Sequence, residues 1–316
     1  MARNDPLLVA VGKARLSGSA KTMYNHKVEA ARFVSDLRAN GYGVSKWSNI
    51  TNKHIQAVVD YWREEKELAT ATIKEYLSGV RSVARAFGNE IISPHNATFG
   101  LGQRTYIATR DRSVPEAIYQ NAIRQLNSGH DLKQRVALAM QLMRELGLRH
   151  EEARKFNPFR DYCDIRETVT IAEGTKGGRE RTFEVSDAQK ALIDQAKRSG
   201  FYTNKNSLIP SRWTERQFEQ YVYREARKLG ISREKCGASL HGLRHARAHE
   251  IYKEISGFNP SCRFKTRDEF IDQARAYAGD RWQDRDNRAR AEVCRQFGHS
   301  PSRRDVSNTY LGSSWS

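Results

Sequence analysis

The chain has 316 residues, with 54 Lys and Arg against 37 Asp and Glu, so its formal net charge at pH 7 is +17. This length predicts two domains or three small ones. No apolar run approaches the ~20 residues of a membrane span, and the apolar patch at residues 7–11 is too weak for a secretory signal. Membrane and secreted classes are therefore excluded, and a cytoplasmic protein is expected.

The positive surplus is spread over both halves of the chain, so no single basic tail explains it. Arginine outnumbers lysine 37 to 17, and guanidinium groups suit bidentate contacts with phosphate. A basic chain of this kind most often binds nucleic acid. The alternative is a basic surface without a partner.

Cys163, Cys236, Cys262 and Cys294 are scattered and form no CxxC pair. This spacing predicts reduced thiols rather than a zinc knuckle or a disulfide framework.

The first part of the chain predicts a small helical domain. Residues 1–20 are polar and contain Gly12 and Gly18, which predicts a flexible N-terminal arm. Helices follow from about residue 22 to 40, from 51 and from 70 to 87. Apolar residues define the face of the first helix expected to be buried: Tyr24, Val28, Ala31, Val34 and Leu37.

Basic residues on the exposed faces of these helices could follow a phosphate backbone. They are Lys21, Lys27, Arg32, Lys74, Arg81 and Arg85. With a linker ending near residue 110, residues 21–110 are expected to form a DNA-binding domain.

Residues 111–316 predict a second domain that is mostly helical with one small antiparallel sheet, so the fold class is mainly α with some β. Helices are expected at about 115–127, 131–146, 214–229, 240–256, 267–278 and 284–297. The only clear strand patterns are 168–171 and 181–185, which form a hairpin with a basic, glycine-rich tip. Ser186 and Gln189 make a capping box for another helix.

Five stretches of the second domain stand out when they are considered together. They are ELGLRHEE at 145–152, the hairpin tip with Lys176, LHGLRH at 240–245, FGHS at 297–300 and NTYL at 308–311. In this order they resemble the tyrosine recombinase (phage integrase) family, whose motifs are TGLR..E, a hairpin lysine, HGLRH, LGH and a late TxxY or TxY. The resemblance spans roughly 112–316; residues 21–110 fit the core-binding domain of that family by position and helical character alone.

The resemblance implies an enzyme that cleaves and rejoins duplex DNA through a covalent 3′-phosphotyrosine, with no metal, ATP or other cofactor. Tyr310 would be the nucleophile. Arg149 and Arg244 would hold the two non-bridging oxygens of the phosphate. Lys176 would give a proton to the leaving 5′-oxygen.

Three further residues complete the implied site. His241 would help to accept the tyrosine proton, and His299 would hydrogen-bond a non-bridging oxygen. Glu152, three residues after Arg149, would orient a neighbouring side chain. Glu151 is its rival, although the spacing favours Glu152.

Basic residues near these motifs have alternative interpretations. Arg179 and Arg181 are rivals of Lys176, and its place after Gly174-Thr175 fits the family best. Arg179 and Arg247 are expected to contact phosphates of the DNA, with a surface charge as the alternative for Arg247.

His241, His245 and His249 lie at i, i+4 and i+8 on one helix face. The pair His245 and His249 has the spacing of the two zinc ligands in an HExxH motif. Ala246 stands where the catalytic Glu of that motif belongs, and nearby arginines would repel a dication. A metal site is therefore not expected, and His245 is interpreted as a packed residue or as one that orients a neighbouring site residue.

Two departures from the family pattern concern the C-terminal part. The 55 residues between Arg244 and His299 predict a charged helical insertion at about 257–293. Only six residues follow Tyr310, so Leu311 and Trp315 offer at most a short hook for a neighbouring protomer. We hypothesise that the insertion replaces a longer tail as the protomer contact.

The function expected from the resemblance is site-specific recombination for a mobile element, as an integrase, or next a chromosome-dimer resolvase. Two DNA sites, a tetramer and a Holliday junction are implied, with accessory DNA-bending proteins as further partners, at the nucleoid of a bacterial cytoplasm. The alternatives are a type IB topoisomerase or hairpin-forming resolvase, and a DNA-binding regulator of the same fold without catalysis.

Overall fold

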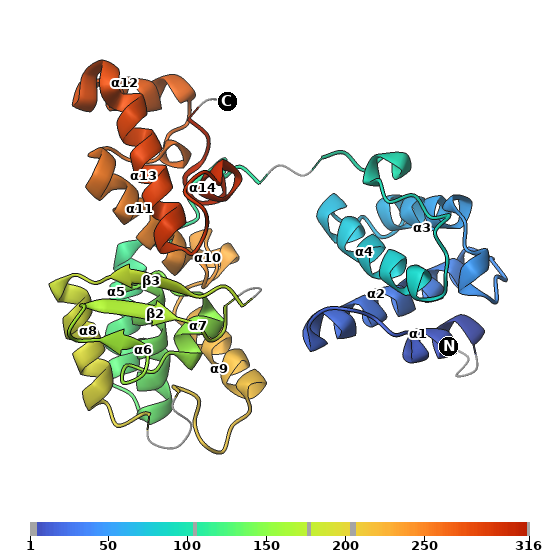
Figure 1. Ribbon diagram of the computed structural model, residues 1–316, viewed down its shortest axis with the longest axis horizontal. Coiled ribbons are helices and arrows are strands. Elements are labelled where there is room, and N and C mark those ends of the chain that lie inside the picture. Colours follow the sequence, from blue (N-terminus) through green and yellow to red (C-terminus); the bar gives the residue numbers. More distant parts are fainter. Residues whose placement is uncertain (1–4, 104–105, 176–177, 203–206, 315–316) are drawn as a thin grey trace. The chain divides into compact units, whose positions relative to one another are not determined.

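The computed structural model describes residues 5–103, 106–175, 178–202 and 207–314. The chain divides into two compact units, Met1–Thr105 and Tyr106–Ser316, which are described separately below (Figure 1). None of the described helices is long and apolar enough to span a membrane.

The first unit is built from helices. Its elements are α1 (Pro6–Lys13), α2 (Ala20–Ala39), η1 (Trp47–Asn49), α3 (Asn52–Glu64), α4 (Thr70–Ala86) and η2 (Asn96–Phe99). Helices α2 and α4 pack closely because Gly79 leaves room, since a Cβ there would lie 2.7 Å from Glu29 Cβ. The predicted helices of residues 21–87 are therefore confirmed.

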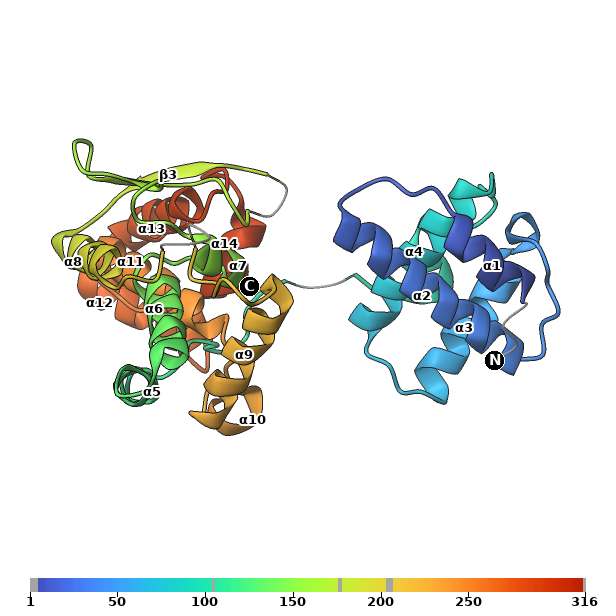
Figure 2. The same cartoon turned by 90° about the horizontal axis from the view of Figure 1, so that it is seen from below.

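The expectation of a flexible arm over residues 1–20 is wrong for residues 6–13, which form α1 against α2 (Figure 2). Asp5 accepts hydrogen bonds from the first free backbone amides, and Pro6 occupies the first turn, where its missing N–H costs nothing. Leu7 and Val11 are buried in the core of the unit. The flanking glycine and serine residues hide this short helix in the sequence.

The predicted buried face of α2 is correct at Val34 and Leu37 and wrong at the start of the helix. Tyr24 is 68% exposed, whereas Ala30 and Phe33 are fully buried together with Val34 and Leu37. The apolar stripe therefore runs only along the second half of the helix.

Arg81 also differs from its prediction as an exposed DNA contact. Its side chain is buried, donates to Ser93 O at 2.9 Å and to Asn96 Oδ1 at 2.8 Å, and lies over the ring of Phe99. The arginine thus ties α4 to the segment that follows it.

The second unit begins with α5 (Glu116–Asn127), α6 (Asp131–Glu145) and α7 (His150–Lys155). Strands β1 (Tyr162–Cys163), β2 (Thr168–Ile171) and β3 (Arg181–Glu184) form an antiparallel sheet in the order β1-β2-β3. Val169 pairs with Tyr162 on one side and with Phe183 on the other. The hairpin is confirmed, and β1 adds a short strand that the sequence pattern did not indicate.

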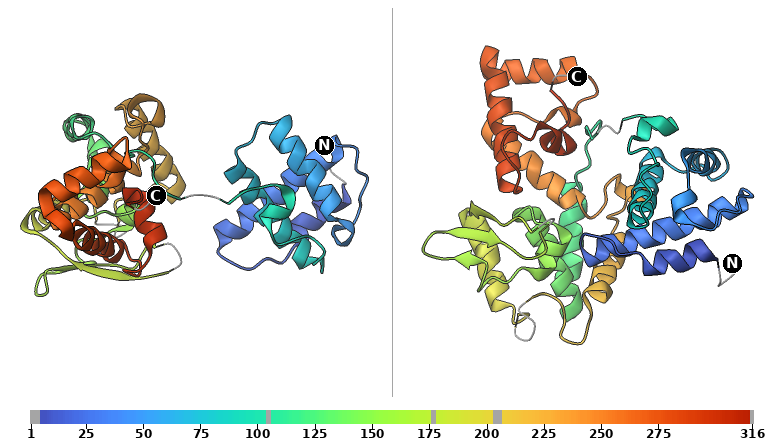
Figure 3. Two further views of the ribbon diagram at one scale, coloured as in Figure 1. Left: turned by 90° about the horizontal axis from the view of Figure 1, so that it is seen from above. Right: turned by 45° about the vertical axis from the view of Figure 1, so that its right-hand side comes forward.

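Helices make up the rest of the unit. They are α8 (Asp187–Arg198), α9 (Glu215–Lys228), α10 (Arg233–Cys236), α11 (Gly242–Ser256), η3 (Ser261–Arg263), α12 (Arg267–Ala278), η4 (Gly279–Arg281), α13 (Trp282–Gln296) and α14 (Arg304–Leu311). Helices α11 to α14 gather at one end of the unit, and the sheet lies toward the other (Figures 1 and 3). The predicted mainly helical fold with a small sheet is confirmed.

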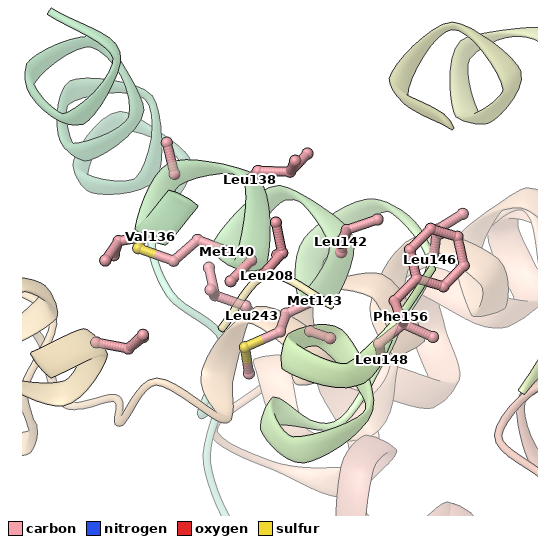
Figure 4. Close-up of a cluster of buried hydrophobic side chains, with 14 of the residues drawn as sticks. Val136, Leu138, Met140, Leu142, Met143, Leu146, Leu148, Phe156, Leu208 and Leu243 are labelled. Carbon is pink, nitrogen blue, oxygen red and sulfur yellow. The ribbon is translucent and has the colours of Figure 1, made fainter. Parts of the chain in front are cut away.

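Two hydrophobic clusters hold this unit together. One surrounds α6, where Val136, Met140 and Met143 pack with Phe156 and Leu243 (Figure 4). The other joins α11, α12, α13 and α14 and includes Tyr252, Phe270, Val293, Phe297 and Leu311. Because Leu243 on α11 belongs to the first cluster and Tyr252 to the second, α11 is shared by both cores.

Candidate active site

The turn between α6 and α7 places Arg149 beside the second core. Gly147 has φ +63°, and a Cβ there would lie 2.7 Å from Phe297 Cε1, so only glycine suits both the backbone and the contact. Arg149 then precedes α7, and its backbone N–H donates to Glu152 Oε2 at 2.7 Å. The Gly-Leu-Arg spacing thus fixes the start of α7.

Glu152 is fully buried and binds several arginines. Arg149 Nη1 donates to Oε1 at 2.7 Å, and Arg181 donates to both carboxylate oxygens at 2.8 and 2.5 Å. Arg244 Nη1 lies 3.7 Å from Oε2. Burial alone would raise the pKa of Glu152, but the hydrogen bond and charge of Arg181, with Arg244 and Arg149, lower it to about 2. The carboxylate is therefore charged and fixes the relative positions of these guanidinium groups.

Arg244 has no exposed surface and is held on every side. It donates to Gly147 O, to Phe297 O at 3.2 Å and, through Nε, to the hydroxyl of Tyr310 at 3.1 Å. Burial lowers the pKa of Arg244 to about 10, so the group keeps its charge at neutral pH. The predicted pair of Arg244 and Tyr310 therefore meets in the structure.

Tyr310 sits on α14 with 6% of its surface exposed. Its ring centroid is 4.8 Å from that of His245 and 5.0 Å from that of Phe297. On the other side its carbonyl faces His249, whose Nε2 lies 2.9 Å away. Since Arg263 donates to His249 Nδ1 at 3.2 Å, the ring proton must be on Nε2, and it is donated to Tyr310 O.

The histidines at the site are uncharged at neutral pH. His241 reaches the surface next to the Tyr310 ring, at 6.0 Å between centroids. Lost hydration and then the charges of Arg244 and Arg149 lower the pKa of His241 to about 4. Lost hydration and Arg149 do the same to His299, whose pKa is also about 4 and whose Nε2 lies 3.2 Å from Arg149 Nη2. Both rings can therefore accept a proton.

The remaining residues predicted near the site of the second unit are Lys176, Arg179, Glu151 and Arg247. Lys176 lies outside the described residues, and Arg179 is exposed beside the hairpin tip. Glu151 is not part of the buried cluster and pairs with Lys155. Arg247 lies close to Glu250 and Glu254, at 3.4 and 3.3 Å.

Basic residues of the first unit have different environments. Lys21 and Arg85 are exposed. Lys27 donates to Gly12 O at 2.8 Å, and Lys74 donates to Gly102 O. Both lysines therefore have backbone partners within their own unit.

Sequence reasoning missed residues that hold α14. Asp286 is fully buried and accepts from Tyr252 Oη at 2.6 Å, from Arg290 Nε at 2.8 Å and from Ser314 Oγ at 2.8 Å. Arg290 in turn donates to Asn308 Oδ1 at 3.1 Å and Gly312 O at 2.8 Å. The i, i+4 spacing of Asp286 and Arg290 on one helix was a signal for this pair.

Arg181 was also missed as a member of the buried cluster and was considered only as a rival of Lys176. Strand alternation could have placed it, because Arg181 and Phe183 share the buried side of β3. Among the residues that the structure describes, no three His, Cys, Asp or Glu side chains are placed to hold a metal ion.

The chain is similar to known proteins in sequence and fold. Residues 102–250 match the family described as Integrase, and residues 1–93 match the phage integrase N-terminal family. No protein sequence of curated function matches.

Two similar solved structures cover nearly the whole chain. A lambda integrase fragment, solved as a dimer bound to a COC′ core site, has a TM-score of 0.59 and 17% identity over 97% of this chain and 93% of its own. The Tn1549 transposon integrase, in complex with transposon right-end DNA, has a TM-score of 0.57 and 13% identity over 97% and 95% of the two chains. Similarity at this level shows a shared fold.

Proposed function

The chain belongs to the tyrosine recombinase (phage integrase) family of site-specific DNA recombinases, and we propose that it cleaves and rejoins duplex DNA through Tyr310. The observation that carries this is the contact between the Tyr310 hydroxyl and Arg244 Nε, within a cluster where Glu152 also binds Arg149. A nucleophile and two cationic groups thus meet at one place. The solved relatives bound to DNA support duplex DNA as the partner.

The proposed reaction is a transesterification at phosphorus. The Tyr310 oxygen attacks, its bond to phosphorus forms, and the bond between phosphorus and the 5′-oxygen breaks. Neutral His241 takes the phenolic proton, and Arg149 and Arg244 stabilise the charge on the non-bridging oxygens. Lys176 gives the departing 5′-oxygen a proton, and His299 adds a hydrogen bond to the phosphate.

Rejoining is the same reaction in reverse. A 5′-hydroxyl attacks the 3′-phosphotyrosine and releases Tyr310, so the energy of the broken bond is retained and neither ATP nor a redox step is needed. We propose that four protomers act on two sites through a Holliday junction, for a mobile element in a bacterial cytoplasm. DNA-bending proteins would assist the assembly.

A covalent adduct is the test. The chain would be incubated with a pool of nicked suicide duplexes of random core sequence, and protein–DNA adducts resolved on denaturing gels. Wild type and Tyr277→Phe, an exposed tyrosine on α12, should form adducts, and Tyr310→Phe should form none. Arg149→Ala should slow adduct formation by about 10²–10³.

Two results would contradict the proposal. One is the absence of any adduct with wild type, which would favour a DNA-binding regulator. The other is free relaxation of a supercoiled plasmid that carries no paired sites, which would assign a topoisomerase activity instead.

A further inference from the structure

A polar cavity of about 410 Å³ borders the proposed site at His241. Its lining includes His241, His245 and Thr309, the residue before Tyr310, but none of the groups that hold the reacting phosphate. Three arginines complete it, namely Arg110, Arg112 and Arg233. The cavity therefore adjoins the reacting centre and is distinct from it.

The segment that carries two of these arginines, residues 108–114, is fixed at both ends. Ala108 N–H donates to Asn308 O of α14 at 2.9 Å, and Val114 N–H donates to Gly242 O of α11 at 3.2 Å. A Cβ at Gly242 would lie 2.6 Å from Arg112 O, so glycine permits this close approach. Segment 108–114 is thus anchored to the helices that carry Tyr310 and Arg244.

The charge of the arginines is not neutralised locally. Asp111, the acidic residue of segment 108–114, is paired with Arg263 at 3.1 Å and lies 3.6 Å from His249 Nδ1. Among the described residues, no carboxylate forms an ion pair with Arg110, Arg112 or Arg233. Asp111 therefore anchors the segment and leaves its neighbours free to bind an anion.

The histidines do not add to this charge. Lost hydration, followed by the charges of neighbouring groups, lowers the pKa of His245 to about 3, and that of His241 is about 4. At neutral pH the positive charge of the cavity comes from the three exposed arginine side chains. Forked guanidinium donors without a carboxylate partner suit a phosphate group.

We propose that this cavity binds a second backbone phosphate of the cleaved DNA strand, adjacent to the phosphate attacked by Tyr310. The identity of the ligand rests on the proposed function. Successive phosphates of one strand are about 3.4 Å apart along the duplex axis, so a phosphate that reacts at Tyr310 has a close neighbour on either side along its strand. The cavity adjoins Tyr310 through Thr309 and lies where one of these neighbours can be bound. Holding it would fix the direction of the strand across the site.

The salt dependence of DNA binding tests the proposal without requiring cleavage. Each phosphate neutralised contributes about 0.9 to the slope of log K against log salt concentration. A variant with Arg110→Ala, Arg112→Ala and Arg233→Ala should lose about 1 from the slope on a random-sequence duplex. A matched variant with Arg124→Ala, Arg166→Ala and Arg198→Ala, which are exposed elsewhere, should change it by less than about 0.3.

Equal slopes for the cavity variant and wild type would overturn the proposal, as would an equal loss in the matched variant. Thermal unfolding of both variants should match wild type, because all six side chains are exposed. The slope measurement tests phosphate binding by the cavity even if no adduct forms. Failure of the cavity proposal can therefore be distinguished from failure of the proposed reaction.

On a duplex that gives an adduct, a neutral methylphosphonate would replace each phosphate next to the cleaved one in turn. At one of the two positions the methylphosphonate should reduce adduct formation by wild type. At the same position it should cause no additional reduction in the cavity variant, which has already lost the arginines. If the methylphosphonate and the arginine substitutions reduced adduct formation independently at both positions, so that their effects multiplied, the cavity would not bind an adjacent phosphate.

Discussion

Replacing Glu152 by Gln removes the buried negative charge that Arg149, Arg181 and Arg244 share, without changing the shape of the side chain. The lowering of the Glu152 pKa from 4.5 to about 2 corresponds, at about 1.4 kcal/mol per unit, to about 3 kcal/mol of stability. Breaking a buried ion pair costs about 3–5 kcal/mol. Both arguments predict that Glu152→Gln destabilises the second unit by about 3 kcal/mol.

The pH dependence of unfolding gives the sign of this effect. The folded-state pKa of Glu152 is depressed, so its contribution is fully present above about pH 4.5 and is lost as the pH falls toward about 2. The free energy difference between wild type and Glu152→Gln should therefore be about 3 kcal/mol at pH 7 and shrink below pH 4.

Hydrogen exchange of peptides from residues 106–316, measured during urea unfolding of the full chain, isolates the second unit. Glu151→Gln is the matched control, because Glu151 is exposed and pairs only at the surface with Lys155; it should cost at most about 1 kcal/mol. A loss below about 1 kcal/mol for Glu152→Gln, or one that stays constant down to pH 3, would refute the reasoning.

The remaining predictions also compare a buried residue with an exposed neighbour. Asp286→Asn should destabilise the second unit by about 3–5 kcal/mol, because Arg290 loses its buried partner. Asp284→Asn, at an exposed position, should change the free energy of unfolding by less than about 0.5 kcal/mol. Similar losses for the two variants in the same exchange experiment would contradict this prediction. Arg81→Ala should lower the stability of the first unit by about 1–3 kcal/mol, and exposed Arg85→Ala should not. Calorimetry checks the second pair, and a loss of DNA affinity by Arg81→Ala with unchanged stability would count against it.

The elements that the sequence predicted well are those with long, regular patterns. Helices α4, α5, α6 and α9 follow from apolar periodicity, and the hairpin of β2 and β3 follows from strand-forming residues around a glycine-rich turn, all of which act within a few positions. The short helices α1 and α14 have eight residues each, and their formation depends on packing of Leu7 and Leu311 into cores made by distant segments. Such contacts leave no local signal.

The partners of charged residues were likewise easier to predict when they lie close in the sequence than when they lie far apart. Glu152, which the three-residue spacing favours over Glu151 for orienting a neighbouring side chain, accepts a hydrogen bond from Arg149, and both ends of this contact lie in one turn. The contact of Arg181 with Glu152 joins residues 29 positions apart. Strand alternation with Phe183 indicates that Arg181 faces inward, but no local pattern identifies Glu152 as its partner. Arg81 shows the opposite error, since its buried partners at Ser93 and Asn96 lie beyond the end of its helix.

The charged segment expected as an insertion between Arg244 and His299 contributes contacts to the helix of Tyr310. Arg263 sets the tautomer of His249, which donates to the carbonyl of Tyr310. Asp286 orients Arg290, whose other nitrogen holds Asn308 and Gly312 on either side of Tyr310. The hydrogen bonds from His249 to Tyr310 O and from Arg290 to Gly312 O are buried, so each is stronger than a surface hydrogen bond and costly to break. Part of the segment is therefore needed within its own chain to hold the helix of Tyr310, and the protomer contact hypothesised for the segment would fall to its exposed face, where Tyr277 is 58% exposed.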